Sequence, residues 1–80
     1  MAGVDTATIR RLLEDAFPAA ASVDVEDRTG GGDHFQVTVV SGDFDGVPLI
    51  DQHRRVNDAL AGPLADGSIH ELRIRTKGTA

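Results

Sequence analysis

Apolar residues recur along this chain with two different periods, and the changes of period predict where helices and strands lie. The first stretch with helical spacing has apolar side chains at four positions: Ile9, Leu12, Leu13 and Ala16. Asp5 or Thr6 can cap the start of this helix with a side-chain oxygen. Phe17-Pro18 should end it, because the residue before a proline avoids the helical region. We therefore expect an N-terminal helix with one buried face.

Strict alternation of apolar and polar residues follows this helix and predicts two strands. The first strand is expected from Ser22 to Arg28 and the second from His34 to Ser41. The side chains expected to face the core are Val23, Val25, Phe35, Val37 and Val39. The segment Thr29–Asp33 contains three consecutive glycines and reads as a flexible loop. The two strands should therefore form a hairpin.

Helical spacing returns in the stretch Phe44–Leu60, around which the rest of the chain is organised. A turn at Asp43–Gly46 opens the stretch, and the apolar residues then share one face: Leu49, Ile50, Val56 and Leu60. Pro48 is tolerated near the helix start, where its missing N–H is not needed. Gly62-Pro63 should stop the helix. One extra helical turn is expected at Leu64–Gly67.

A third strand is expected from Ser68 to Thr76, followed by a frayed end at Lys77–Ala80. The side chains of this strand that should point inward are Leu72 and Ile74. The element order is therefore α-β-β-α-(turn)-β. A right-handed crossover makes the last strand parallel to the second if the two are neighbours. We predict an α+β fold in which two helices cover one face of a three-stranded mixed sheet.

Length and composition limit the classes of protein to which the chain can belong. Eighty residues make a single domain, which we assign to residues 1–80 with an ordered core over about 5–76. The absence of cysteine excludes disulfides and favours a reducing, cytoplasmic location. No stretch is long and apolar enough to span a membrane. Residues 1–5 lack the basic and apolar regions of a signal peptide.

The net charge of −5 is divided unevenly along the chain. Residues 1–50 hold three arginines against nine acids, and residues 51–80 hold five basic residues against four acids. An acidic domain repels phosphate backbones, which weighs against nucleic acid as the main partner. The basic residues that could still contact phosphates are Arg54, Arg55, Arg73 and Arg75. With three aromatic residues the chain offers no stacking platform, and a solvated charged face is the favoured interpretation.

Histidines are the side chains that could carry chemistry. His34 and His70 should lie at the same end of the sheet if the second and last strands are parallel neighbours. Spacing alone nevertheless favours ordinary solvated or hydrogen-bonded histidines, and His53 is expected to be a surface or packing residue in mid-helix. An enzyme finds no support, because there is no cysteine nucleophile and no serine has an evident base and acid beside it.

Four motifs, in this order, resemble the BolA-like protein family. They are the strand His34–Ser41, the turn Phe44-Asp45-Gly46, the helical Gln52-His53-Arg54 with Val56 and Leu60, and the strand Ile69-His70-Glu71-Leu72. The resemblance extends from about Ile9 to Thr76. It implies the BolA fold, which is similar to the class II KH arrangement. Glutamine stands at residue 52, where the family typically has arginine.

The resemblance also implies a function. Family members pair with monothiol glutaredoxins and help to handle [2Fe–2S] clusters, so a non-enzymatic adaptor that shares a cluster with a glutaredoxin and its glutathione is expected, in iron–sulfur trafficking or in iron and redox regulation. The implied ligands are His70 and, from the loop end, His34. Gly31 stands where cysteine-bearing relatives have a ligand. The alternative is a DNA-binding transcriptional regulator of the stress or morphology type that uses the four arginines above.

Overall fold

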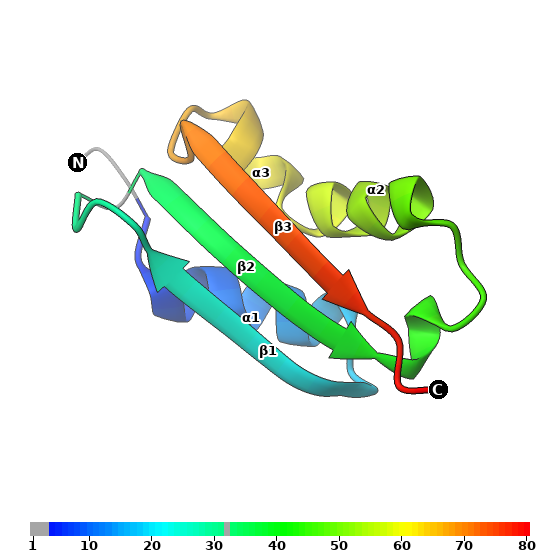
Figure 1. The fold of residues 1–80 in the computed structure, drawn as a ribbon. Coiled ribbons are helices and arrows are strands. Elements are labelled where there is room, and N and C mark those ends of the chain that lie inside the picture. The colour runs from blue at the N-terminus through cyan, green and yellow to red at the C-terminus, as the bar shows by residue number, and fades with distance from the viewer. Residues whose placement is uncertain (1–3, 32) are drawn as a thin grey trace.

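The chain folds into a three-stranded sheet with helices packed on one face (Figure 1). The computed structural model describes residues 4–31 and 33–80. The elements are α1 (Thr6–Ala16), β1 (Ala20–Asp27), β2 (His34–Ser41), the 3-10 turn η1 (Gly42–Phe44), α2 (Leu49–Ala59), α3 (Ala61–Ala65) and β3 (Glu71–Lys77). The expected order α-β-β-α-(turn)-β and the α+β class are confirmed.

Strand β2 lies in the centre of the sheet, antiparallel to β1 and parallel to β3. The predicted hairpin and the predicted parallel pairing are both present. Phe35 pairs in register with Leu72, and His34 pairs with Glu71. The two parallel strands therefore begin at the same end of the sheet. This end carries the two candidate histidines.

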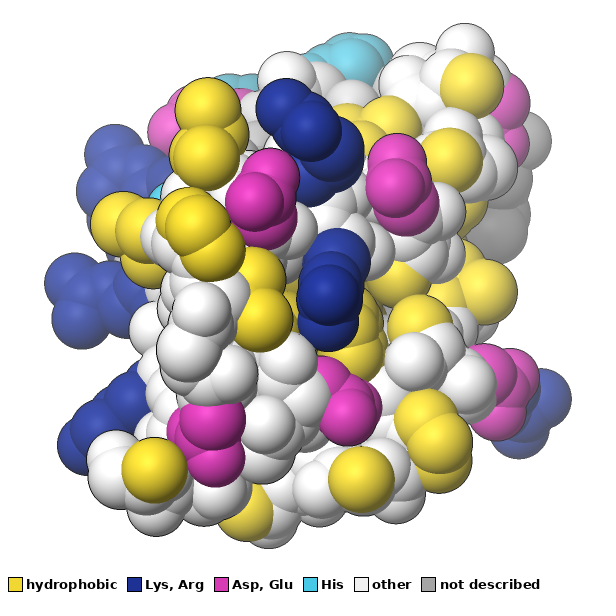
Figure 2. Space-filling view, turned by 90° about the vertical axis from the view of Figure 1, so that its right-hand side faces the viewer, with side chains coloured by type: hydrophobic (Ala, Val, Ile, Leu, Met, Phe, Trp, Pro, Cys, Tyr) yellow, Lys and Arg dark blue, Asp and Glu magenta, His cyan; other side chains and the backbone are white. Residues whose placement is uncertain are grey.

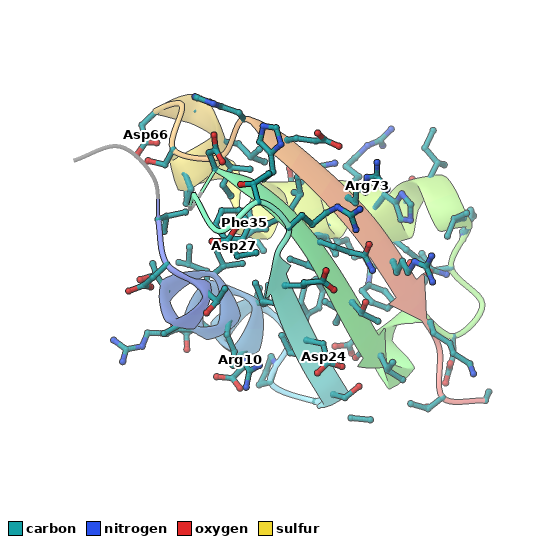
Figure 3. All side chains as sticks on the ribbon, turned by 60° about the vertical axis from the view of Figure 1, so that its left-hand side comes forward. Arg10, Asp24, Asp27, Phe35, Asp66 and Arg73 are labelled. Atoms are coloured by element: carbon teal, nitrogen blue, oxygen red, sulfur yellow. The ribbon has the colours of Figure 1, made fainter. Side chains whose placement is uncertain are left out.

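One apolar core joins the sheet to the helices. Its fully buried side chains from β2 are Phe35, Val37 and Val39, and those from the helices include Ile9, Leu13 and Val56. Phe35, labelled in Figure 3, is the second residue of β2 and is fully buried. Asp24 and Arg73, which the same figure labels, are exposed residues of the two outer strands. The strict alternation of burial along β2 confirms the sequence-based assignment of its inward residues.

Helix α1 begins and ends as its sequence predicts. The carboxylate of Asp5 caps it by accepting a hydrogen bond from the Thr8 amide at 2.8 Å. Two hydrogen bonds from Thr8 lower the pKa of Asp5, and the side-chain bond contributes more than the backbone bond. At the other end, Phe17 donates its amide to Leu13 and packs its ring against Phe44, with ring centroids 5.2 Å apart.

The apolar face of α2 is shorter than expected. Val56 and Leu60 are fully buried, as predicted, but Leu49 is 60% exposed and Ile50 is 69% exposed. Seven residues are almost two full helical turns, so Leu49 points in nearly the same direction as Val56 but lies about 10 Å away along the axis. Helical spacing fixes the direction of a side chain, whereas burial also requires a neighbour at that height. The shared apolar face of the helix is therefore buried at Val56 and Leu60 and exposed at Leu49 and Ile50.

The end of α2 also differs from the prediction. The helix ends at Ala59, Leu60 leaves the helical region, and the short helix α3 then contains Gly62 and Pro63. Pro63 does not stop α3 because it lies in the first turn, where backbone N–H groups have no partner within the helix. The break therefore lies at Leu60, before Gly62-Pro63. The expected glycine exit is present at Gly67, which has a φ of +82°.

Strand β3 begins later than expected, at Glu71, and ends at Lys77 instead of Thr76. The residues before it lead into the strand: Ile69 is 4% exposed, and the His70 amide donates to the backbone oxygen of Asp33 at 2.8 Å. Strand β1 starts at Ala20, two residues earlier than predicted, and ends at Asp27, one residue earlier.

The residues after β3 are held by hydrogen bonds, so the expectation of a frayed end is wrong. The carboxylate of Asp45 accepts hydrogen bonds from the backbone amides of Thr79 at 2.8 Å and Ala80 at 3.2 Å. The hydroxyl of Thr79 donates to the same carboxylate at 3.3 Å. Asp45 lies in the turn that follows β2, and three hydrogen bonds to one carboxylate explain why this segment lies against that turn.

Candidate metal centre

The parallel pairing of β2 with β3 brings two histidines together. His34 is the first residue of β2, and His70 directly precedes the first residue of β3. The backbone oxygen of Asp33 accepts hydrogen bonds from the amides of His70 at 2.8 Å and Glu71 at 3.3 Å. These bonds fasten the two strand starts to each other. The sequence-based expectation that His34 and His70 lie at the same end of the sheet is confirmed.

Asp33 joins the two histidines as a third possible ligand, which the sequence had not indicated. Its Oδ2 atom lies 3.6 Å from Nδ1 of His70 and 4.0 Å from Nε2 of His34. One ligand atom from each of the three residues lies within 4.8 Å of the other two. An aspartate at the end of a glycine-rich loop is ordinary turn chemistry. Its position beside His34 was the available signal.

The side chain of Asp33 is fixed by the loop itself. The hydroxyl of Thr29 donates to Oδ1 of Asp33 at 3.1 Å and, in turn, accepts from the Gly31 amide at 3.2 Å. The carboxylate of Asp27 accepts from the amides of Thr29 and Gly30, which closes the turn after β1. Because Oδ1 is engaged by Thr29, Oδ2 is the oxygen directed at the histidines.

Glu71 lies on the other side of His34. Its Oε2 atom is 3.5 Å from Nδ1 of the imidazole, and its Oε1 atom accepts from Nε of Arg73 at 3.3 Å. His34 therefore has a carboxylate near each ring nitrogen, Glu71 at Nδ1 and Asp33 at Nε2. This arrangement defines the direction in which each nitrogen of the ring points.

The turn before His70 has its own support. The carboxylate of Asp66 accepts a hydrogen bond from the Ser68 amide at 2.8 Å. Hydrogen bonds from Ser68 lower the pKa of Asp66, and the side-chain bond contributes more than the backbone bond. Ile69 is buried in the core beside this turn. His70 directly follows this turn and the buried Ile69, and its own side chain is 63% exposed at the rim.

The side chains of Asp33, His34 and His70 offer nitrogen and oxygen ligands at an accessible end of the sheet. The side chains of Asp33 and His34 are each 36% exposed. Two imidazoles with a carboxylate suit borderline divalent metals such as zinc or iron, whereas calcium and magnesium favour oxygen alone. Without a thiolate, the chain cannot supply the four cysteines of an ordinary iron–sulfur cluster. Any additional sulfur ligand must come from another molecule.

The remaining residues of the resemblance have other roles or positions. His53 is half-buried on α2 and does not belong to the metal-competent group found among the described residues. Gly31 has no side chain to offer as a ligand. Gln52 is structural: it donates to the backbone oxygens of Val47 at 2.7 Å and Phe44 at 3.3 Å, and it accepts from the Thr76 hydroxyl at 2.6 Å.

Acidic side chains lie beside two of the four arginines of the alternative function. Arg54 lies 3.6 Å from the Asp51 carboxylate, and Arg73 is bound to Glu71. Basic, acidic and apolar side chains are interspersed on the face seen in Figure 2.

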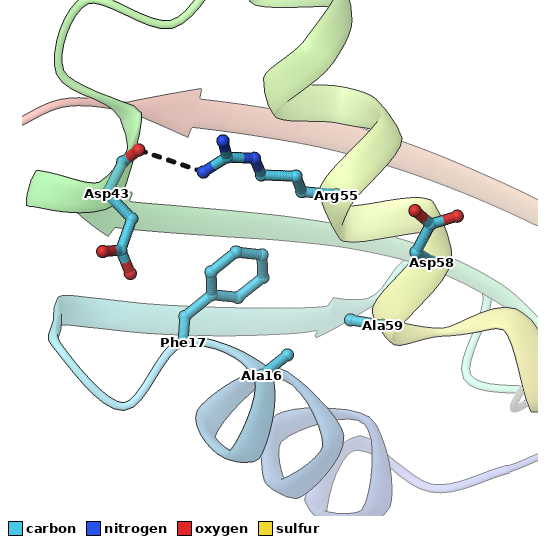
Figure 4. Close-up of a pocket in the computed structure, with 6 residues that line it drawn as sticks. All are labelled: Ala16, Phe17, Asp43, Arg55, Asp58 and Ala59. Atoms are coloured by element: carbon cyan, nitrogen blue, oxygen red, sulfur yellow. Dashed lines mark hydrogen bonds between the residues drawn. The ribbon is translucent and has the colours of Figure 1, made fainter.

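Arg55 belongs to an open hollow of about 390 Å³, and it donates to the Asp43 backbone oxygen at 3.2 Å (Figure 4). The Asp58 carboxylate lines the same hollow. These acidic neighbours reduce the attraction for phosphate.

Comparison with known proteins defines the class, an α+β domain with a mixed three-stranded sheet. The structure of BolA1 from Arabidopsis thaliana superimposes with a TM-score of 0.83 at 27% identity, covering 95% of both chains. The family model described as BolA-like protein matches residues 13–80. The chain therefore belongs to the BolA-like family.

Two relatives by sequence extend this comparison. BolA-like protein 1 of Mus musculus is 36% identical over 99% of this chain, which spans 61% of the mouse protein. A protein of Vibrio cholerae named DNA-binding transcriptional regulator BolA is 48% identical over 62% of this chain and 46% of its own length. Within residues 4–31 and 33–80, no helix is both long enough and apolar enough to cross a membrane.

Proposed function

We propose that this domain is a non-enzymatic adaptor that binds a monothiol glutaredoxin and shares a [2Fe–2S] cluster with it. The observation that carries the proposal is the convergence of His34 and His70 at one exposed edge of the sheet. Their side chains are 36% and 63% exposed, so a partner can reach them. Membership of the BolA-like family supports the proposal. The cysteine-free composition suits a reducing location such as the cytoplasm.

The donor set fits a cluster that is shared between two molecules. Imidazole replaces cysteine on one iron in Rieske centres, so His70 and His34 are suitable iron ligands. The chain has no cysteine, and the glutaredoxin thiolate and its glutathione would supply the sulfur ligands. The role of this chain is to hold two imidazoles at fixed positions by means of the paired strand starts. The cluster, when bound, supplies the redox and iron-transfer chemistry.

The test mixes the purified domain with a cluster-loaded monothiol glutaredoxin. We expect an altered visible absorption or circular dichroism spectrum and a heterodimer on size exclusion. His70→Ala should abolish the spectral change while leaving the fold intact, because the side chain lies at the rim. His34→Ala should weaken the change. His53→Ala is the matched control, a histidine outside the group, and should behave like the parent.

Two results would contradict this proposal in different ways. Unchanged spectra together with separate elution of the two proteins would exclude the adaptor function. Loss of the cluster signal in His53→Ala, with the signal kept in His70→Ala, would mean that the ligands are misassigned although the partner is right.

DNA binding is the second candidate function, and the name of the Vibrio cholerae relative is the observation that favours it. Arg54 and Arg55 on α2 are exposed, but the net charge is −5 and both arginines have acidic neighbours. Salt-dependent retention of the domain on duplex DNA, lost on replacing both arginines by alanine, would establish this function. Retention that does not depend on salt would count against it.

A further inference from the structure

The end of the sheet that carries the two histidines also carries a carboxylate that could bind the same metal ion. Asp33, His34 and His70 offer one oxygen and two nitrogens within 4.8 Å of one another. We propose that the domain alone, without a partner protein, binds one divalent transition-metal ion such as Zn²⁺ through these three residues. This inference goes beyond cluster sharing, because it requires no glutaredoxin and adds Asp33 as a ligand.

The distances are close to those of a bound ion. Zinc bonds to nitrogen and oxygen are about 2.0–2.2 Å long, which places neighbouring ligand atoms of a tetrahedral site about 3.3–3.6 Å apart. The separation of Asp33 Oδ2 from His70 Nδ1 is 3.6 Å, and that from His34 Nε2 is 4.0 Å. The two imidazole nitrogens lie within 4.8 Å of each other, so the partly exposed side chains must move by up to about 1 Å to close a tetrahedral site.

The backbone holds the three residues next to one another. Asp33 and His34 are adjacent in the chain, and the His70 amide donates to the Asp33 backbone oxygen at 2.8 Å. The Thr29 hydroxyl binds Oδ1 of Asp33 at 3.1 Å and leaves Oδ2 for the ion. Binding therefore requires little ordering of the chain, which reduces its entropic cost.

Glu71 supports His34 from outside the ligand set. A histidine that binds a metal usually donates its second N–H to a carboxylate, which fixes the tautomer and the ring orientation. The Oε2 atom of Glu71 lies 3.5 Å from Nδ1 of His34 and favours the tautomer with hydrogen on Nδ1. The lone pair then lies on Nε2, the atom that faces Asp33. Glu71 is therefore a positioning residue for this site.

The donor set selects the class of ion. Two imidazoles exclude ions that require oxygen ligands alone, and the absence of thiolate disfavours Cu(I). Three protein ligands with an open fourth position are common at accessible zinc sites. The exposed fractions of the three side chains, 36% for Asp33 and His34 and 63% for His70, leave that position to water.

The test uses the untagged domain with Zn²⁺ in isothermal titration calorimetry, and with Co²⁺ as an absorbing substitute. We expect one ion per chain. Asp33→Asn and His70→Ala should each weaken the affinity at least tenfold. Asp24→Asn is the matched control, because it makes the same change of charge at an exposed position of β1, and it should bind like the parent.

A second measurement does not depend on variants. The ring nitrogens of His34 and His70 should shift in ¹⁵N spectra when Zn²⁺ is added, whereas those of His53 should stay in place. Glu71→Gln should weaken binding and alter the tautomer signal of free His34, which a purely structural role would not change.

Three results would overturn this inference: no binding of Zn²⁺ or Co²⁺, unchanged affinity in Asp33→Asn, or equal losses in Asp24→Asn and Asp33→Asn. Failure here would leave the shared cluster untouched, because that proposal is measured with the glutaredoxin present. Conversely, an ion bound by the isolated domain together with unchanged spectra in the glutaredoxin mixture would support this inference alone.

Discussion

Replacing Val56 by aspartate should unfold the domain, and the structure sets the size of the effect. Val56 has no exposed surface and lies in the core between α2 and the sheet. Valine and aspartate have similar volumes, so the substitution changes polarity and leaves no large cavity. The new carboxyl group would lie among apolar side chains, where it would have to stay protonated or be buried as a charge.

The expected loss is comparable with the whole stability of the domain. A domain of 80 residues has a free energy of unfolding of about 4–12 kcal/mol at the usual values per residue. Losing the burial of one valine side chain costs about 1.5–3 kcal/mol. An unpaired buried polar group costs roughly 2–7 kcal/mol in addition. We therefore expect Val56→Asp to show no cooperative thermal transition by circular dichroism.

The matched control is Ile50→Asp, the same kind of substitution on the same helix. Ile50 is 69% exposed in the first turn of α2, where an added negative charge interacts favourably with the helix dipole. The free energy of unfolding of Ile50→Asp should stay within about 0.5 kcal/mol of that of the parent. A cooperative melt of Val56→Asp near that of the parent, or unfolding of Ile50→Asp, would show that the buried face of α2 is assigned wrongly.

Two further predictions concern the backbone and the pH. Gly46→Ala should destabilise the domain by about 1–2 kcal/mol, because Gly46 has a φ of +73°. Gly62→Ala, in helix α3 with open space around it, should stabilise the domain by about 0.5–1 kcal/mol, and urea unfolding measures both. The pKa of Asp5 is lowered in the folded state, so its stabilisation is complete above the unfolded pKa and is lost as the pH falls through the folded pKa. Asp5→Ala should be less stable than the parent at pH 7, and urea midpoints should show this difference shrinking as the pH falls below the unfolded pKa of aspartate, about 3.9.

The elements with regular patterns could be predicted from the sequence. Strand β2 has the predicted bounds, because three inward residues alternate with polar ones between a glycine loop and a turn. Helix α1 has the predicted cap and stop, because Asp5 and Phe17-Pro18 are local signals. A helical crossover joins β2 to β3, and parallel pairing of these neighbours brings His34 and His70 to the same end of the sheet.

The remaining differences depend on neighbours that a local pattern does not contain. Leu49 has the helical spacing of a core residue, yet it is 60% exposed. The segment after β3 was expected to fray, and its order depends on Asp45, a residue far away in the sequence. Asp33 has the appearance of a loop residue, and its position beside His70 arises from the backbone bond between two strand starts.

The parallel pairing of β2 with β3 has a consequence for the order of folding. His34 and His70 are 36 positions apart in the sequence, and the whole of α2 and α3 lies between them. The β1–β2 hairpin needs only a short loop to close, whereas β3 can pair only after the crossover has folded back. During synthesis, the two imidazoles therefore meet only after β3 has been made and has docked. A ligand captured at this edge would bind the completed fold and no earlier intermediate, and it would slow the release of β3.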